Sequence, residues 1–330
     1  MAFPKKPPGL RRISRRFNFF GAPKSWSFQM LEFHTLDVFT ETPFAGNPLA
    51  VVLNADTLTT QQMQSIAREF NLSETIFVQA PQDPTHTARV RIFFPTDEIP
   101  FAGHPTIGCA IHLACARHTG DFETLITLEE EAGLVPVTVI RHGNHIEAEF
   151  VAPVLPFPVK TDLSVDLIAA SLGLTPAQIG FANHRPATHQ GGPRFLYVPI
   201  DTLGTLGQAI PQEPHWSVLM ALADVDSAYL YTPGAAAADA TCDYQARMFS
   251  PTAGIAEDPA TGSASAILAS QLWRTGVIPL GSTSLTLRQG VEMGRPSQIG
   301  LSIDATAQGL IAVRIKGSAV PISSGKIRRP

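Results

Sequence analysis

Short segments typical of β-strands recur along most of the chain. They are rich in β-branched and aromatic residues and are bounded by turn residues, as in "ARVRIFF", "VPVTVI" and "LIAVRIK". The segment "RHGNH" between two of them predicts a hairpin turn. Apolar residues at helical spacing predict a helix over 60–70, with Thr59 or Thr60 as its N-cap. Further apolar runs follow His104 and Asp258, so we expect many short strands and a few helices.

One segment of the chain is repeated in its second half. "RIFFPTDEIPFAGHPTIGCA" starts at Arg91 and "RMFSPTAGIAEDPATGSASA" starts at Arg247, an offset of 156 residues, and Arg, Phe, Pro, Thr and Ile recur in register. Closing the loop by two residues then places His104 opposite Asp258, each directly before a proline. Repeats indicate duplicated structural units. The sequence therefore predicts two similar halves, each with a strand, a loop and a helix.

The prolines after His104 and Asp258 predict where two helices begin. Proline needs no N–H partner at the first helical position, so both polar residues are expected to be N-caps. Free N–H groups at a helix start bind anions, and the small residues Gly103, Gly262 and Ser263 let a ligand approach the backbone. If the halves face each other, both helix starts lie in one cleft, where a carboxylate or an enolate is stabilised. The alternative is that Asp258 is an ordinary cap and His104 a surface turn residue.

A candidate acid–base group stands in "NLSETIFV". Glu74 follows Ser73 where the predicted helix gives way to an apolar strand. Burial at this place disfavours the ionised carboxylate and raises its pKa toward the range useful for proton transfer. The alternative is that strand alternation points Glu74 outward into solvent. In "TPFAGNPLAVV", Asn47 lies in another Gly-polar-Pro loop and can donate hydrogen bonds into the cleft, although Asn in a turn is usually structural.

The composition indicates a folded protein of two domains. The chain has 330 residues, of which 44% are hydrophobic and 16% charged. No apolar run reaches the roughly 20 residues of a membrane helix, so we expect a soluble protein without a membrane partner. The net charge of −4 combines +7 over residues 1–30 with −11 over the remainder, and an acidic body argues against a nucleic-acid partner.

Residues 1–30 are expected to be a disordered basic leader, with Met30 as a natural start. The twin-arginine-like "SRRFNFF" lacks the apolar stretch of an export signal. The cysteines Cys109, Cys115 and Cys242 form no CxxC pair, which suits a reducing cytoplasm. HExxH, the dinucleotide and P-loop signatures and GxSxG do not occur in the sequence. We therefore expect cytoplasmic chemistry that uses no cofactor and no metal.

Five segments, in order, resemble signature segments of the phenazine-biosynthesis isomerase-like (PhzF-like) family: "FTETPFAGNPLAVV", "NLSETIFV", "FAGHPTIG", "EDPATGSA" and "QGVEMGRPS". The resemblance extends from about residue 31 to 318. It implies a diaminopimelate-epimerase-like α+β fold of two pseudo-symmetric domains, each an antiparallel β-sheet wrapped around a central helix. The expected organisation is a leader at 1–30, domains at 31–157 and 158–320, and a tail at 321–330.

The same resemblance implies a cofactor-independent isomerase, commonly a homodimer, in which one Glu moves a proton between carbons of a small carboxylated substrate. The match to "LSET" assigns this role to Glu74. His104 and Asp258 are expected to assist proton transfer or to hold a substrate amine. The matched positions that line the site are Ser73, Gly103, His104, Asp258, Gly262 and Ser263.

Two other functions stay open at this point. Related epimerases and racemases use two cysteines near these helix ends; here Cys109 alone falls opposite Ser263 in the repeat, which favours a one-base isomerase over a racemase. A non-enzymatic protein that binds a small carboxylate would use the same cleft. The motifs do not determine the substrate, and the dihydro-hydroxyanthranilate of phenazine pathways is one candidate.

Overall fold

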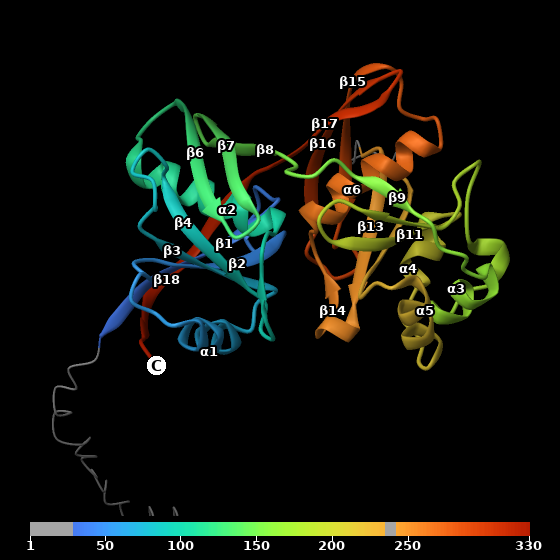
Figure 1. Ribbon diagram of the computed structural model, residues 1–330, viewed down its shortest axis with the longest axis horizontal. Helices are drawn as coiled ribbons and strands as arrows, with labels where there is room; N and C mark the ends of the chain where they lie inside the picture. The colour runs from blue at the N-terminus through green and yellow to red at the C-terminus, as the bar shows by residue number, and fades with distance from the viewer. Residues whose placement is uncertain (1–28, 235–241) are drawn as a thin grey trace, which may run out of the picture.

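Two lobes of similar construction lie side by side in the computed structural model, which describes residues 29–234 and 242–330 (Figure 1). Each lobe has one central helix surrounded by strands, α2 in the first lobe and α6 in the second. The predicted α+β class is therefore confirmed. The predicted leader lies outside the described residues up to position 28, and Met30 is the first residue of β1.

The first lobe combines the N-terminal part of the chain with its last strand. Its helices are α1 (Thr60–Phe70) and α2 (Gly103–Arg117). Its strands are β1 (Met30–Val38), β2 (Asn47–Val52), β3 (Glu74–Gln79), β4 (Ala88–Phe93), β5 (Glu98–Ile99), β6 (Phe122–Glu130), β7 (Gly133–His142), β8 (His145–Val151) and β18 (Ala319–Arg328). Thr59 caps α1 through reciprocal hydrogen bonds with Gln62, and α1 buries Met63, Ile66 and Ala67. The predicted helix over 60–70 is confirmed.

The second lobe is built from the elements between β8 and β18. Its helices are α3 (Val165–Ser171), α4 (Leu203–Gln208), α5 (His215–Ala223) and α6 (Gly262–Arg274), with the 3₁₀ turns η1 (Pro176–Gln178) and η2 (Pro251–Ala253). Its strands are β9 (Phe157–Val159), β10 (Ala187–Gln190), β11 (Arg194–Pro199), β12 (Ala228–Pro233), β13 (Tyr244–Ser250), β14 (Ile255–Asp258), β15 (Gly281–Gln289), β16 (Ser297–Thr306) and β17 (Gly309–Gly317).

One continuous order of hydrogen-bonded strands runs through both lobes. The first lobe follows the order β18-β1-β2-β3-β4-β6-β7-β8. The second follows β9-β10-β11-β12-β13-β15-β16-β17, and β8 pairs with β17 where the lobes meet. The two orders correspond step by step, as the repeat in the sequence predicts.

The predicted antiparallel sheets need a correction, because most strand pairs are antiparallel but each lobe also contains two parallel pairs. β2–β3 and β4–β6 are parallel pairs, as are β11–β12 and β13–β15 in the second lobe. A helix lies between the partners of each parallel pair in the sequence: α1, α2, α4 with α5, and α6. A crossover through a helix returns the chain in its original direction, so the strands on either side of it run parallel.

The predicted domain limits also need correction. β18 pairs with β1 along its length, from Met30↔Arg328 to Val38↔Ala319, so most of the predicted tail at 321–330 belongs to the first lobe (Figure 1). The predicted limit at 157/158 falls inside β9, which pairs with β10. β18 and β9 occupy equivalent places in the two lobes. β18 covers the edge of β1, and β9 covers the edge of β10, and each edge would otherwise be exposed.

The repeated segments form equivalent units in the two lobes. Arg91 on β4 donates from Nε to Glu98 Oε1 at 2.7 Å, and Arg247 on β13 donates from Nε to Glu257 Oε1 at 2.8 Å. Each guanidinium also lies over the phenylalanine two residues later on its own strand. The same ion pair and ring contact thus recur just before α2 and α6, which supports duplication.

The two central helices begin at glycines, and the predicted N-caps are wrong. The N-cap residues are Ala102 and Thr261, whereas His104 is the second residue of α2 and Asp258 is the last residue of β14. Pro105 is the third residue of α2. The first four N–H groups of a helix have no partner within it, so a proline is tolerated there and does not mark the first residue.

Candidate active site

The starts of α2 and α6 meet where the two lobes face each other. A Cβ built on Gly103 would lie 3.0 Å from the Cα of Gly262 and 3.3 Å from the nitrogen of Ser263. β2 and β3 run parallel with Leu49 opposite Glu74, so both strands begin at the same edge of the sheet. The structure brings all eight predicted site residues to this junction: Asn47, Ser73, Glu74, Gly103, His104, Asp258, Gly262 and Ser263.

Glu74 and His104 form a buried pair. Their exposed fractions are 7% and 2%, so the alternatives of an outward Glu74 and a surface His104 are wrong. Glu74 Oε2 lies 3.3 Å from His104 Nδ1. Burial raises the pKa of Glu74 well above its usual range, and the charge of Asp258 raises it further. Burial lowers the pKa of His104 to about 3, so the imidazole is uncharged at neutral pH.

The side chain of Asn47 connects the two lobes. Its Nδ2 donates to Asp258 Oδ1 at 2.8 Å and to the Ala260 carbonyl at 2.9 Å, and it lies 3.3 Å from His104 Nδ1. Because two of these three neighbours are oxygen acceptors, the amide NH₂ must face them. Gly46, just before Asn47, has φ +65°, and a Cβ on it would lie 2.3 Å from the Val38 carbonyl oxygen, so glycine is required there.

Asp258 is buried but well supplied with hydrogen bonds. Burial raises its pKa to about 6, while hydrogen bonds from Thr261, Asn47 and Ser73 act in the opposite direction. The Thr261 hydroxyl donates to Asp258 Oδ2 at 2.6 Å. Near neutral pH, Asp258 is therefore mainly ionised, whereas burial favours the protonated form of Glu74.

Three polar atoms at the junction are buried and have no hydrogen-bond partner among the described residues. They are Asn47 Oδ1, Glu74 Oε2 and His104 Nε2. Buried polar atoms in proteins are nearly always hydrogen-bonded. Three such atoms from three elements in one cluster indicate a place where a polar ligand completes the hydrogen bonding.

Sequence reasoning missed two supporting residues, Thr261 and Gln289. The Gln289 amide donates to the Asp258 carbonyl at 2.8 Å and to Thr261 Oγ1 at 2.9 Å, and its oxygen accepts from the Thr261 N–H at 3.1 Å. These bonds hold the segment between β14 and α6. Gln289 is the first residue of "QGVEMGRPS", so the signal was present, but without contacts the segment is an ordinary turn.

Cys109 does not reach the site. It is fully buried within α2, and burial raises the pKa of its thiol. Counted from the first residues of α2 and α6, Ser263 corresponds to His104, whereas the repeat in the sequence aligns it with Cys109. Over residues 29–234 and 242–330, no group of three His, Cys, Asp or Glu side chains is arranged to hold a metal ion.

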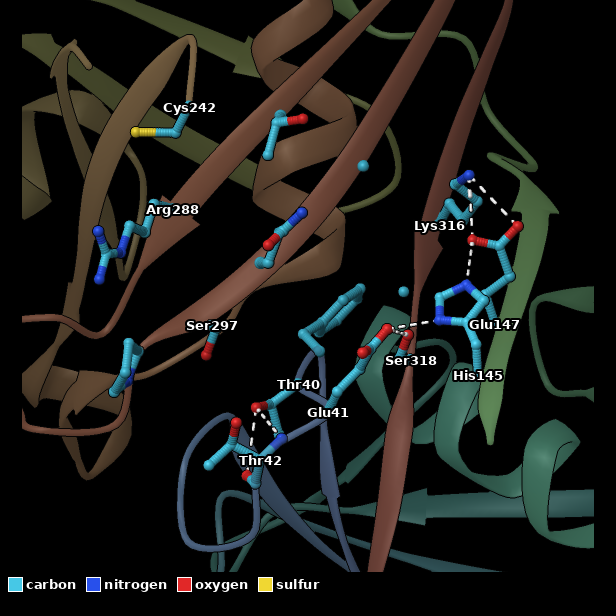
Figure 2. A pocket seen from close by; sticks show the side chains of 16 residues that line it. Thr40, Glu41, Thr42, His145, Glu147, Cys242, Arg288, Ser297, Lys316 and Ser318 are labelled. Atoms are coloured by element: carbon cyan, nitrogen blue, oxygen red, sulfur yellow. Dashed lines mark hydrogen bonds and ion pairs between the residues drawn. The ribbon is translucent and has the colours of Figure 1, made fainter. Parts of the chain in front are cut away.

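A groove of about 700 Å³ opens elsewhere between the lobes, and none of the eight site residues lines it. Figure 2 shows Glu41, His145, Glu147 and Lys316 joined along one wall, with Arg288 toward the other. Phe39 also lines the groove, and its ring lies 3.3 Å from a Cβ built on Gly262. The groove therefore comes close to the start of α6 at Phe39. The acid–base pair of Glu74 and His104 lies in the buried junction and not in the groove.

Comparison with known proteins shows the family of this chain. The family described as "Phenazine biosynthesis-like protein" (PhzC-PhzF) matches residues 36–325. This chain belongs to the PhzC-PhzF family. It is an isomerase of that family, so the alternative of a non-enzymatic binding protein is wrong.

The relatives of this PhzC-PhzF protein match over most of their length. An uncharacterised isomerase of Mesorhizobium japonicum is 41% identical over 295 residues, 88% of this chain and 96% of that protein. Trans-2,3-dihydro-3-hydroxyanthranilate isomerase of Pseudomonas aeruginosa is 35% identical over 298 residues, 90% of this chain and 99% of that protein.

Solved structures confirm the fold. A PhzF-family phenazine biosynthesis protein of Bacillus anthracis superimposes with a TM-score of 0.80 at 24% identity, over 91% of this chain and 99% of that one. A probable proline racemase of Agrobacterium radiobacter has a TM-score of 0.62 at 15% identity, over 91% and 93%. The epimerase-like fold is thus confirmed. Among the described helices, none combines the length and apolar character that a membrane crossing requires.

Proposed function

We propose that this PhzC-PhzF isomerase moves a proton between two carbons of a small carboxylated substrate without a cofactor, with Glu74 as both base and acid. The observation that carries the proposal is the buried Glu74 carboxyl group. Its Oε2 lies 3.3 Å from His104 Nδ1 and has no hydrogen-bond partner among the described residues. A raised pKa makes the carboxylate a stronger base and still lets the acid give the proton back near neutral pH.

The reaction then consists of two proton transfers through one oxygen atom. In the first, a substrate C–H bond breaks, an O–H bond forms on Glu74, and the electron pair stays on the substrate as an enolate-type anion. In the second, the Glu74 O–H bond breaks and a C–H bond forms at another carbon. The N–H groups at Gly103 and Gly262, which begin α2 and α6, are suited to the substrate carboxylate and the developing negative charge.

His104 and Asp258 have different roles in this proposal. The neutral His104 ring lies beside the Glu74 carboxyl group, with Nδ1 3.3 Å from Oε2, and its buried Nε2 is available to bond to the substrate. The Asp258 carboxylate, held by Thr261 and Asn47, attracts a substrate amine. The name of the Pseudomonas aeruginosa relative specifies a dihydro-hydroxyanthranilate, which carries a carboxylate and an amine. We therefore propose a cyclic amino acid of this class as substrate.

Replacing Glu74 by Gln tests the proposal, because the amide preserves shape and removes the titrating proton. With trans-2,3-dihydro-3-hydroxyanthranilate as the probe in D₂O, the wild-type enzyme should place deuterium at one carbon of the product. In Glu74→Gln, kcat should fall by about 10²-fold or more. Glu130→Gln, which alters a second buried carboxyl group on β6, is the matched control and should keep wild-type kcat at pH 7.

Each outcome of this experiment has a separate meaning. Full activity of Glu74→Gln would refute Glu74 as the acid–base group. Product without deuterium from the wild-type enzyme would refute exchange of the Glu74 proton with solvent during the reaction. No conversion of the probe would refute the proposed substrate. The homodimer and the cytoplasmic location stay predictions, and sedimentation equilibrium checks the first.

A further inference from the structure

Arg295 links the loop between β15 and β16 to the first lobe. Its Nε donates to the Gly46 carbonyl at 2.8 Å, and its Nη2 donates to the Ala45 carbonyl at 2.9 Å. The same Nη2 lies 2.5 Å from Asp37 Oδ1 on β1. One guanidinium of the second lobe therefore holds two backbone carbonyls and one carboxylate of the first lobe.

These contacts hold the segment that leads into Asn47. Asp37 Oδ2 accepts from the Phe44 N–H at 2.7 Å, and the Gly46 N–H donates to the Pro296 carbonyl at 3.2 Å. The next residue, Asn47, is fully buried and reaches Asp258 with its amide. The position of the Asn47 side chain thus depends on the backbone of Ala45 and Gly46, which Arg295 and Pro296 hold through hydrogen bonds.

The same loop also contacts the second-lobe side of the site. A Cβ built on Gly290 would lie 2.5 Å from the Arg295 carbonyl oxygen and 2.7 Å from the Pro259 carbonyl oxygen. The Arg295 N–H donates to the Gly290 carbonyl at 3.0 Å, which closes the loop. Since Gln289 bonds to the Asp258 backbone, the loop spans from Asp258 to the segment before Asn47.

We propose that Arg295 is an interdomain positioning residue, which sets the distance between Asn47 and Asp258 by holding the Ala45 and Gly46 carbonyls from the opposite lobe. This inference rests on the proposed function of the junction as the active site. Arginine suits the role because its planar fork donates in several fixed directions at once, whereas the ammonium of lysine is a compact point charge on a flexible stem.

An ordinary surface ion pair is the competing interpretation, and such pairs contribute little to stability. The Arg295 side chain is 28% exposed, whereas its partner Asp37 is 5% exposed. Arg314 offers a matched control, because it is 30% exposed and pairs with Asp304 on the neighbouring strand of the same lobe. Both arginines make ion pairs, but Arg295 hydrogen-bonds to residues of the opposite lobe, whereas Arg314 hydrogen-bonds to Asp304 of its own lobe and interacts with Glu149 on β8 through charge.

The pH dependence of kcat separates positioning from simple stabilisation. The Asn47 hydrogen bond lowers the pKa of Asp258, so displacement of Asn47 should raise that pKa above about 6 and move the acidic limb of the profile to higher pH. The other titratable groups around Asp258 are Glu257 on the same strand as Asp258, Glu74 on β3, His104 on α2 and Tyr229 on β12. Within the described structure, Arg295 makes no hydrogen bond to any of these groups.

The experiment compares Arg295→Gln and Arg295→Lys with Arg314→Gln. Amide hydrogen exchange of the full chain should show faster exchange at Phe44 and Gly46 in Arg295→Gln and wild-type exchange in Arg314→Gln. With the dihydro-hydroxyanthranilate probe, kcat of Arg295→Gln should fall about tenfold to hundredfold, with the acidic limb displaced. In Arg295→Lys, both kcat and amide exchange at Phe44 and Gly46 should be intermediate between the wild type and Arg295→Gln. This variant replaces Arg295→Gln in the test if Arg295→Gln does not fold.

The two proposals fail in different ways. Wild-type exchange at Phe44 and Gly46 in Arg295→Gln would overturn the positioning role, whatever the activity. The same holds if kcat and the pH profile of Arg295→Gln equal those of Arg314→Gln. If the wild-type enzyme does not convert the probe, the proposed substrate fails, while the exchange experiment still decides whether Arg295 holds the segment before Asn47.

Discussion

Replacing Gly103 by Ala tests whether the close contact of the two helix starts assembles the site. The added Cβ would lie 3.0 Å from the Cα of Gly262, 3.2 Å from its carbonyl carbon and 3.3 Å from the nitrogen of Ser263. Carbon atoms pack best at about 3.5–4.0 Å, so the helix starts must separate by roughly 0.5–1 Å. All three neighbours are backbone atoms, so no side-chain rotation relieves the contact. Overpacking of this kind costs about 1–3 kcal/mol of unfolding free energy.

The same displacement acts on the hydrogen bonds that cross between the lobes. The bond from Asn47 Nδ2 to Asp258 Oδ1 measures 2.8 Å, and a lengthening of roughly 0.5–1 Å takes it beyond the ordinary range of a hydrogen bond. We therefore expect kcat to fall about tenfold to hundredfold. The thermal unfolding midpoint should fall by about 2 °C for each kcal/mol lost.

Gly207→Ala is the control for Gly103→Ala. Gly207 lies on α4, and apart from its chain neighbours and the nearby backbone of its own helix, no described heavy atom lies within 4 Å of a Cβ built on it. Alanine is favoured over glycine in a helix by about 1 kcal/mol, so this variant should be as stable as the wild type or more so, with unchanged kcat. The assays are thermal unfolding and turnover of the dihydro-hydroxyanthranilate probe. Wild-type kcat together with a wild-type midpoint in Gly103→Ala would refute the steric reasoning.

Two further predictions concern buried groups outside the site. Burial raises the pKa of Glu130 to about 8 from about 4.5, so the folded protein keeps a proton that the unfolded chain releases, and stability falls as pH rises between these values. Urea unfolding measures the free energy of unfolding at pH 5 and at pH 8, and its decrease between these two pH values should be smaller in Glu130→Gln than in the wild type by about 1 kcal/mol or more. Equal decreases in the two proteins would contradict the burial of Glu130. Cys109, which is buried with a raised pKa, should resist iodoacetamide in the folded protein while the exposed Cys115 reacts, and peptide mass spectrometry showing rapid labelling of Cys109 would contradict this.

Several features of this isomerase follow from the sequence alone. The helix over 60–70 is defined by its own capping box and apolar face, and the repeat starting at Arg91 and Arg247 defines two equivalent units. These features depend on residues close together in the chain, where propensity and spacing act directly. The short Gly-polar-Pro segments also identify the candidate site residues, because close backbone approach requires small residues at Gly103 and Gly262.

The tertiary structure decided the rest. Asn47 and Asp258 are 211 residues apart in the chain, and Asp37 and Arg295 are 258 apart, so local pattern contains no information about either contact. The return of β18 to the first lobe is decided in the same way, because it depends on a free edge of β1. The pKa directions at Glu74 depend on burial and on a charge from the other lobe, and both exist once the two lobes have packed against each other.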